Sequence, residues 1–377
     1  MKSFLLFCFA ALNGIIFAQN NLTFSFTYQD SVRAYKVYVP QKYLDNPTAE
    51  VPLLLNLHGL GSENWQQEVY GDFRPIADTE NFIICHPNGT FNSSGQRFWN
   101  AGFASTIDDI GFLSALIDTL KLKYNINDEK VFSTGMSNGG FMSLTLACEL
   151  SDKVKAVASV TGSMTINQIT NCSNTSAIPV MQIHGTADPT VAYNGSLGVA
   201  GIEAVVGFWV NHNGCDSVAV ITNVADVNST DNSTATRYDF NQNCGDDAAV
   251  VFYKIENGGH TWPGGSFLLP GLVTNLDFDA SAAIWKFFSP DYVSVRINSV
   301  PENDLKVKVY PNPSNNFLEV KVADLENLLN VKIFNETGDL VLEQTENRIN
   351  ISNLNQGVYF MKIKTDSGFY TKKFLKK

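Results

Sequence analysis

The sequence predicts an α/β domain with a mainly parallel central sheet, followed by a small all-β domain. Near-continuous apolar runs such as VPLLLNL at Val51–Leu57 are typical of parallel strands buried on both faces. These runs alternate with segments of helical periodicity, such as IGFLSALIDTLKLKY after Asp108 and Asp109, which we expect to cap that helix. After about Ser289 the pattern changes to short alternating runs bounded by turn residues. We therefore expect helices on both faces of the first sheet and a sandwich-like second domain.

The individual elements follow from the same patterns. Two alternating runs, Leu22–Gln29 and Arg33–Pro40, predict antiparallel strands at a sheet edge. Further strands are expected at Val51–Leu57, Asn81–Pro87, from Val131, and at Val154–Val160, Ile178–His184, Val218–Val224 and Val250–Ile255, with later helices at Phe141–Leu150, Gly201–Asn211 and Ala280–Phe288. The tail strands are expected at Lys306–Tyr310, Phe317–Val322, Asn330–Phe334, Asp339–Gln344, Val358–Lys364 and Phe369–Phe374.

The N-terminus has the features of a signal peptide. Lys2 precedes a mostly apolar run, Phe4 to Phe17, and Ala18-Gln19 offers a small-residue cleavage site. The predicted organisation is a signal peptide at 1–18, an α/β domain at 19–290, a linker at 291–304 and an all-β domain at 305–377. The signal peptide predicts an exported protein, and no later run reaches the length of a transmembrane helix.

Charge is distributed unevenly along the 377 residues. The net charge is −11, and residues 301–377 hold 11 Lys and Arg against 10 Asp and Glu, leaving 15 against 27 in the first 300 residues. An acidic main domain argues against nucleic acid as a partner, because phosphates would be repelled.

Five cysteines remain once the signal peptide is excluded. In an oxidising compartment five cysteines indicate two disulfides and one free thiol. Cys85 lies in the apolar run FIIC and is the expected free cysteine. We favour the pairs Cys148–Cys172 and Cys215–Cys244, although the sequence alone leaves the connectivity open.

The stretch VFSTGMSNGG, residues 131–140, carries the strongest chemical signal. It places Ser137 between Gly135 and Gly139 where a strand turns directly into a helix, which is the arrangement of a nucleophile elbow. Side chains at 135 and 139 would clash with the neighbouring strand and helix. Taken alone, the same stretch would also fit an ordinary turn with a capping serine.

Two later loops supply an acid and a base in the order that an α/β-hydrolase fold requires. Asp188 follows the strand IPVMQIH, and His260 follows the strand VVFYKI in a glycine-rich loop. His260 would accept the proton of Ser137, and Asp188 would orient the imidazole. On its own Asp188 would more readily be a turn residue before proline. The order and the strand context together predict a catalytic triad. His58 and His184 border this site and are expected to be structural.

An oxyanion hole requires two backbone N–H donors. One is expected at Asn138, directly after the nucleophile, and the other in the loop His58-Gly59-Leu60-Gly61. We place the second donor at Leu60, with Gly59 and Gly61 as alternatives. Neither H-E-x-x-H nor paired cysteine spacing occurs, and P-loop and dinucleotide fingerprints are absent, so we expect no metal and no cofactor.

The segments IDDIGFLSALIDTL, KVFSTGMSNGGFMSLTLACELSDKVKAVASVTG, IHGTADPTVAYNG and ENGGHTWPGG resemble the extracellular polyhydroxybutyrate depolymerase and feruloyl esterase group, whose wider family includes acetyl-xylan esterases. The resemblance runs from about Leu22 to Phe288 and implies a serine esterase with Ser137, Asp188 and His260 as its triad. Trp262 and Trp99 are then candidates to stack on a feruloyl ring, a sugar or a polyester chain, with ordinary packing as the alternative.

The tail resembles the C-terminal sorting domain of type IX secretion, through VYPNP at 309–313, LNQGVYF at 354–360 and the final YTKKFLKK. That resemblance implies the type IX machinery as a partner and export across the outer membrane, followed by release or surface attachment. A substrate-binding β-sandwich is the alternative for this domain. We expect a secreted serine esterase acting on feruloyl, acetyl-xylan or related soluble esters. The alternatives are a polyhydroxybutyrate depolymerase and a non-catalytic surface binding protein, so the expected substrate is a plant cell-wall ester or a polyester.

Overall fold

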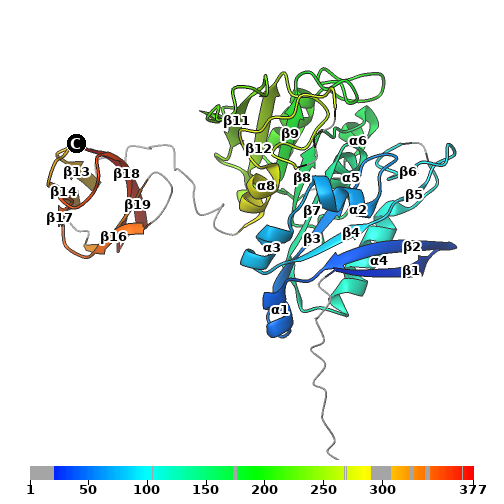
Figure 1. Ribbon diagram of the computed structural model, residues 1–377, viewed down its shortest axis with the longest axis horizontal. Coiled ribbons are helices and arrows are strands. Elements are labelled where there is room, and N and C mark those ends of the chain that lie inside the picture. Colours follow the sequence, from blue (N-terminus) through cyan, green and yellow to red (C-terminus); the bar gives the residue numbers. More distant parts are fainter. Residues whose placement is uncertain are drawn as a thin grey trace, which may run out of the picture. The chain divides into compact units, whose positions relative to one another are not determined.

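The computed structural model describes residues 21–103, 105–172, 176–266, 268, 270–289, 307–322, 327–335, 340–366 and 368–377. The predicted signal peptide and linker lie outside these residues. The chain divides into two compact units, Met1–Ser294 and Val295–Lys377 (Figure 1).

The first unit is built on a ten-stranded sheet whose central strands are parallel. Across the sheet the strands are β1 (Asn21–Tyr28), β2 (Ser31–Tyr38), β4 (Ile83–Pro87), β3 (Val51–Leu57), β7 (Ile126–Met136), β8 (Ala156–Val160), β9 (Val180–Gly185), β12 (Val250–Glu256), β11 (Thr234–Phe240) and β10 (Val220–Asn223). β1 and β2 form the antiparallel edge that the sequence predicts. The mainly parallel sheet confirms the predicted fold class.

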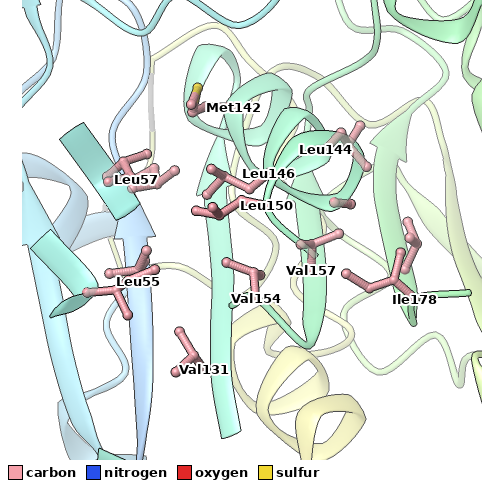
Figure 2. Close-up of a cluster of buried hydrophobic side chains, with 14 of the residues drawn as sticks. Leu55, Leu57, Val131, Met142, Leu144, Leu146, Leu150, Val154, Val157 and Ile178 are labelled. Carbon is pink, nitrogen blue, oxygen red and sulfur yellow. The ribbon is translucent and has the colours of Figure 1, made fainter. Parts of the chain in front are cut away.

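Helices cover both faces of this sheet, because alternate residues of each buried strand face opposite sides. Leu53, Leu55 and Leu57 of β3 join one apolar core with α4, α5 and α7, while Leu54 joins the other with α3 and α8. Figure 2 shows part of the first core, where Leu55 and Leu57 lie near side chains of α5 such as Leu146. The helices are α1 (Gln41–Asp45), α2 (Asn64–Tyr70), α3 (Arg74–Glu80), α4 (Asp109–Lys121), α5 (Asn138–Glu149), α6 (Ile166–Asn171), α7 (Ile202–His212) and α8 (Ala280–Phe288), with the 3-10 turn η1 (Gly245–Asp247).

The two acidic residues at the start of α4 have different roles. Asp108 caps the helix by accepting a hydrogen bond from the Gly111 N–H, as predicted. Asp109 is fully buried and pairs with Arg33 of β2, 2.5 Å away, so it links the edge of the sheet to this helix. A buried carboxylate is stable there because it is paired and hydrogen-bonded.

Both disulfides favoured by the sequence are present. Cys148–Cys172 joins the end of α5 to the end of α6, and Cys215–Cys244 joins the segment after α7 to the loop after β11. Cys85 is free and buried in β4, where burial raises the pKa of its thiol.

The second unit is a sandwich of two antiparallel sheets. Its strands are β13 (Val307–Tyr310), β14 (Phe317–Val322) and β17 (Arg348–Asn350) in one sheet, and β16 (Leu340–Gln344), β15 (Leu328–Phe334), β18 (Gly357–Thr365) and β19 (Gly368–Lys376) in the other. Apolar side chains of both sheets, such as Leu318 and Ile363, share one core. Asn312 holds the last strand by hydrogen bonds to the Lys373 carbonyl and the Leu375 N–H.

Candidate active site

The four loops that carry the predicted site meet at one edge of the sheet. Parallel strands β3, β7, β9 and β12 end at Leu57, Met136, Gly185 and Glu256, and the predicted residues follow each of these ends within four positions. The carboxyl ends of parallel strands are where ligand sites form in open α/β sheets. The topology therefore gathers Leu60, Ser137, Asp188 and His260 at this edge.

Ser137 lies in a strained turn that only its glycine neighbours allow. Its φ and ψ angles are 56° and −121°, and a positive φ is rare for residues other than glycine. A Cβ atom at Gly135 would lie 2.5 Å from the Leu57 carbonyl oxygen, and one at Gly139 would lie 2.1 Å from it. The close approach of β3 thus explains both glycines of the motif, and it brings the loop after β3 against Ser137.

Asp188 and His260 are joined by a hydrogen bond. His260 Nδ1 lies 2.8 Å from Asp188 Oδ2, and the loops that carry them are also linked by the Ala187 N–H donating to the Gly258 carbonyl. The Asp188 side chain is fully buried, whereas that of His260 is 12% exposed. Because Nδ1 faces the carboxylate, Nε2 is the ring nitrogen left for other partners.

The environment of Asp188 favours its charged form. Burial alone would raise the pKa of this carboxyl, but the hydrogen bond and charge of His260 and the Val191 N–H outweigh burial, so the pKa lies below its ordinary value. Oδ1 accepts from the N–H groups of Thr190 and Val191 at 2.8 and 2.9 Å. His184 Nε2 also lies 3.4 Å from Oδ2 and faces the Val191 carbonyl at 2.9 Å, which agrees with the structural role expected for it.

Ser137 is only partly buried and its hydroxyl lies near the loop after β3. A Cβ atom built on Gly59 would lie 3.9 Å from Ser137 Oγ. Within the described part of the chain, no hydrogen bond joins Ser137 Oγ to His260. Catalytic hydrogen bonds in ligand-free enzymes are often long and shorten when substrate binds.

Hydrogen bonds of the loop after β3 involve two of the three residues that the sequence left open as oxyanion donors. Gly61 N–H donates to the Arg97 carbonyl at 2.8 Å, and the backbone of Gly59 hydrogen-bonds to the Tyr70 hydroxyl. The Gly59 carbonyl is held by Ser62 N–H at 3.1 Å and by His58 Nδ1 at 2.7 Å. In a trans peptide the next N–H, that of Leu60, points the opposite way. Among the described residues no hydrogen bond occupies the Leu60 N–H, and Leu60 stays the predicted donor of this loop.

Trp99 and Trp262 do not have the exposure that substrate stacking requires. Their side chains are 0% and 3% exposed. The Trp262 indole donates to Ser281 Oγ at 3.1 Å and packs edge-on against Phe73, and the Trp99 indole donates to the His58 carbonyl at 3.0 Å. Their burial favours the packing alternative and corrects the expectation that they stack on substrate.

Other aromatic rings do lie exposed beside the loop after β3. Trp65 at the start of α2 is 53% exposed, and Phe91 of the hairpin β5 (Thr90–Phe91) and β6 (Arg97–Phe98) is 54% exposed. The Arg97 guanidinium stacks 4.3 Å from the Phe91 ring and pairs with Glu63 at 2.8 Å. We call Trp65, Phe91 and Arg97 the aromatic rim. The aromatic rim was not predicted from the sequence, although Trp65, five residues after Leu60, was a usable signal.

Among the described residues, no group of three or more His, Cys, Asp or Glu side chains is placed to bind a metal ion. None of the described helices combines the length and the apolar character needed to cross a bilayer.

Comparison with known proteins identifies the family of the first unit. Residues 45–211 match the Phospholipase/Carboxylesterase family. The Aspergillus terreus protein named "Probable feruloyl esterase C" is 30% identical over 239 residues, which are 60% of this chain and 76% of that protein. The chain belongs to this carboxylesterase family. It is accordingly a carboxylic ester hydrolase with an α/β-hydrolase fold.

Two further proteins are similar to this carboxylesterase over part of their length. The bifunctional acetylxylan esterase/xylanase XynS20E of Neocallimastix patriciarum is 26% identical over 236 residues, 62% of this chain. The chain spans only 31% of the length of that relative. Among solved structures, an acetyl xylan esterase from Aspergillus awamori has a TM-score of 0.49 at 15% identity, covering 68% of this chain and 94% of that chain.

The second unit of the carboxylesterase matches a different family. Residues 308–377 match the secretion system C-terminal sorting domain. The carboxylesterase is therefore exported across the outer membrane by type IX secretion, as the tail of the sequence predicts.

Proposed function

We propose that Ser137, Asp188 and His260 form the catalytic triad of a secreted serine esterase that acts on feruloyl, acetyl-xylan or related soluble esters. The observation that carries the triad is the 2.8 Å hydrogen bond between His260 Nδ1 and Asp188 Oδ2, on loops that follow β12 and β9, at the sheet edge where Ser137 occupies a strained elbow. Ser137 is the nucleophile, His260 the general base and Asp188 the residue that orients His260.

In this mechanism His260 Nε2 accepts the proton of Ser137 as the Oγ atom attacks the ester carbonyl. Asp188 holds the imidazole in the tautomer that leaves Nε2 free and stabilises the imidazolium. The N–H groups of Leu60 and Asn138 bind the oxyanion of the tetrahedral intermediate. His260 then gives the proton to the leaving alcohol. In the second half of the reaction His260 accepts a proton from water as the water attacks the acyl-enzyme, and it returns that proton to Ser137 Oγ as the acid leaves.

Two observations support esters with an aromatic or sugar component. Several relatives carry the name feruloyl or acetylxylan esterase. The aromatic rim adjoins the proposed oxyanion loop, because Gly61 N–H donates to the carbonyl of Arg97 in that rim. Exposed aromatic rings bind planar aromatic groups and sugar faces by stacking.

The catalytic role of Ser137 is tested by covalent trapping. Wild-type protein should react with a fluorophosphonate at one site and hydrolyse p-nitrophenyl acetate, and Ser137→Ala should do neither. Ser143→Ala is the matched control, because Ser143 lies on the same helix, is fully buried and contacts Ser133 Oγ at 2.9 Å. Labelling or hydrolysis by Ser137→Ala at the wild-type rate would refute the triad and would leave a non-catalytic binding role for this fold.

The substrate class requires a separate comparison. Methyl ferulate, acetylated xylan and polyhydroxybutyrate film should be assayed side by side with the same enzyme preparation. We expect higher kcat/KM on the two soluble substrates than release of acid from the film. Preferential attack on the film would instead support the polyester depolymerase alternative.

A further inference from the structure

We propose that Trp99 is a positioning residue that fixes the two proposed oxyanion N–H donors relative to each other. This inference rests on the proposed function, since it concerns the oxyanion hole of that mechanism. Trp99 follows β6, is fully buried, and contacts the elements that carry both donors.

The first contact is with Asn138, whose backbone N–H is one donor. The Trp99 N–H donates to Asn138 Oδ1 at 2.6 Å, and Asn138 Nδ2 donates to the Trp99 carbonyl at 3.0 Å. The side chain of Asn138 thus pairs with both backbone polar groups of Trp99. This reciprocal pairing fixes the residue after the nucleophile to the loop that carries Trp99.

The second contact is with the loop that carries Leu60. The Trp99 indole N–H donates to the His58 carbonyl at 3.0 Å, and the two rings lie 5.1 Å apart between centroids. Gly89 N–H donates to His58 Nε2 at 2.9 Å, so in the neutral ring Nδ1 carries the hydrogen that Gly59 O accepts. Burial keeps this ring neutral by lowering the pKa of His58 to about 4. The orientation of the Gly59-Leu60 peptide therefore depends on a residue that Trp99 holds.

Trp99 is itself anchored to the body of the domain. The N–H of the next residue, Asn100, donates to Asp109 Oδ2 at 2.8 Å, and Asp109 is paired with buried Arg33. Because this anchor lies outside the site, Trp99 can act as a fixed reference for both donors. Preorganised donors stabilise the oxyanion without reorganisation during the reaction.

The role is positional, because a fully buried ring cannot touch substrate. The oxyanion develops only on the way to the transition state, so misplaced donors should lower kcat and leave KM nearly unchanged. A change in the packing of the substrate site would alter KM instead.

Trp99→Phe tests the inference, because it removes the indole N–H and keeps a buried aromatic ring. We expect kcat for p-nitrophenyl acetate to fall between about tenfold and a hundredfold, with KM within about twofold of wild type. Affinity for a boronic acid that mimics the tetrahedral intermediate should fall by a similar factor. The matched control is Trp209→Phe on α7, since Trp209 is also fully buried and, among the described residues, its indole N–H has no hydrogen-bond partner. That variant should keep the wild-type kcat.

Asn138→Ala provides a second variant in case Trp99→Phe folds poorly. It keeps the backbone N–H of residue 138 and removes both hydrogen bonds to Trp99, so its kcat should also fall at constant KM. Wild-type kcat in either folded variant, or equal losses in Trp99→Phe and Trp209→Phe, would overturn the inference. Ser137→Ala is measured in parallel. If it is inactive while Trp99→Phe is fully active, the positioning role alone fails, and if it is active, the proposed triad fails.

Discussion

Acidification should destabilise the carboxylesterase unit through two histidines that are buried in their neutral form. His86 of β4 is 1% exposed, its Nε2 lies 3.2 Å from Asn56 Nδ2, and among the described residues its Nδ1 has no hydrogen-bond partner. Burial lowers the pKa of His86 to about 4, and burial lowers that of His58 to about 4 as well. In both rings Nε2, the nitrogen that would take the second proton, faces an N–H donor, which is Asn56 Nδ2 for His86 and the Gly89 N–H for His58.

The sign of the effect follows from proton uptake. An unfolded histidine binds a proton below about pH 6.5, whereas these two remain neutral in the folded state until about pH 4. The unfolded state therefore binds more protons between these values, and stability falls as the pH drops through this window. At pH 5 the unfolded state gains roughly 2 kcal/mol for each histidine, since one pKa unit corresponds to about 1.4 kcal/mol.

The assay is urea unfolding at pH 7 and pH 5, followed by tryptophan fluorescence. All five tryptophans precede residue 290, so the signal reports on the first unit alone. Wild type should lose stability on acidification, and His86→Gln should lose about 2 kcal/mol less, because the substitution removes the titration of His86. The contributions of Asp and Glu titrations to the loss of stability are the same in both proteins, so they cancel when the two losses are subtracted.

Trp209→Phe serves as the control for a change of buried volume without a titrating group. Its stability should differ from wild type by the same amount at both pH values. Parallel losses in wild type and His86→Gln would refute the reasoning, because they would show that His86 does not enter the folded state as a buried neutral group.

Four further predictions concern the site, the disulfide and the tail. Trp65→Ala should raise KM for methyl ferulate about tenfold and leave hydrolysis of ethyl acetate unchanged, because only the aryl ester is large enough to stack on the rim. Asp188→Asn should keep the fold by circular dichroism and lower kcat by about 10⁴-fold. The double variant Cys148→Ser/Cys172→Ser should unfold with about 3 kcal/mol less free energy in urea. Deleting residues 308–377 should block export in a secretion assay and spare esterase activity, and an inactive but exported protein would contradict this division of roles.

The sequence predicts the central sheet of this protein well, because parallel strands that are buried on both faces are mostly apolar over their whole length. β3 is a near-continuous apolar run, β9 is buried along its whole length, and both lie in the parallel part of the sheet. β11 was not predicted, because its sequence TATRYDF is largely polar, as expected for a strand that pairs beside an exposed edge. The short helices α2 and α3 between β3 and β4 were missed for a similar reason, since each shows only about two turns of periodicity.

The candidate triad could be predicted from the sequence because its members follow the strands β7, β9 and β12 in the chain order Ser, Asp, His. The groups that hold the site in place have no such order. Trp99 lies 41 residues from His58 and 39 from Asn138, and only the folded sheet brings the three together. A tryptophan in a loop can face substrate or core, and nothing local in the sequence distinguishes the two. The hydrogen bonds of Trp99 decide between them, because they join this buried residue to Asn138 and to the loop that carries Leu60, the two proposed N–H donors.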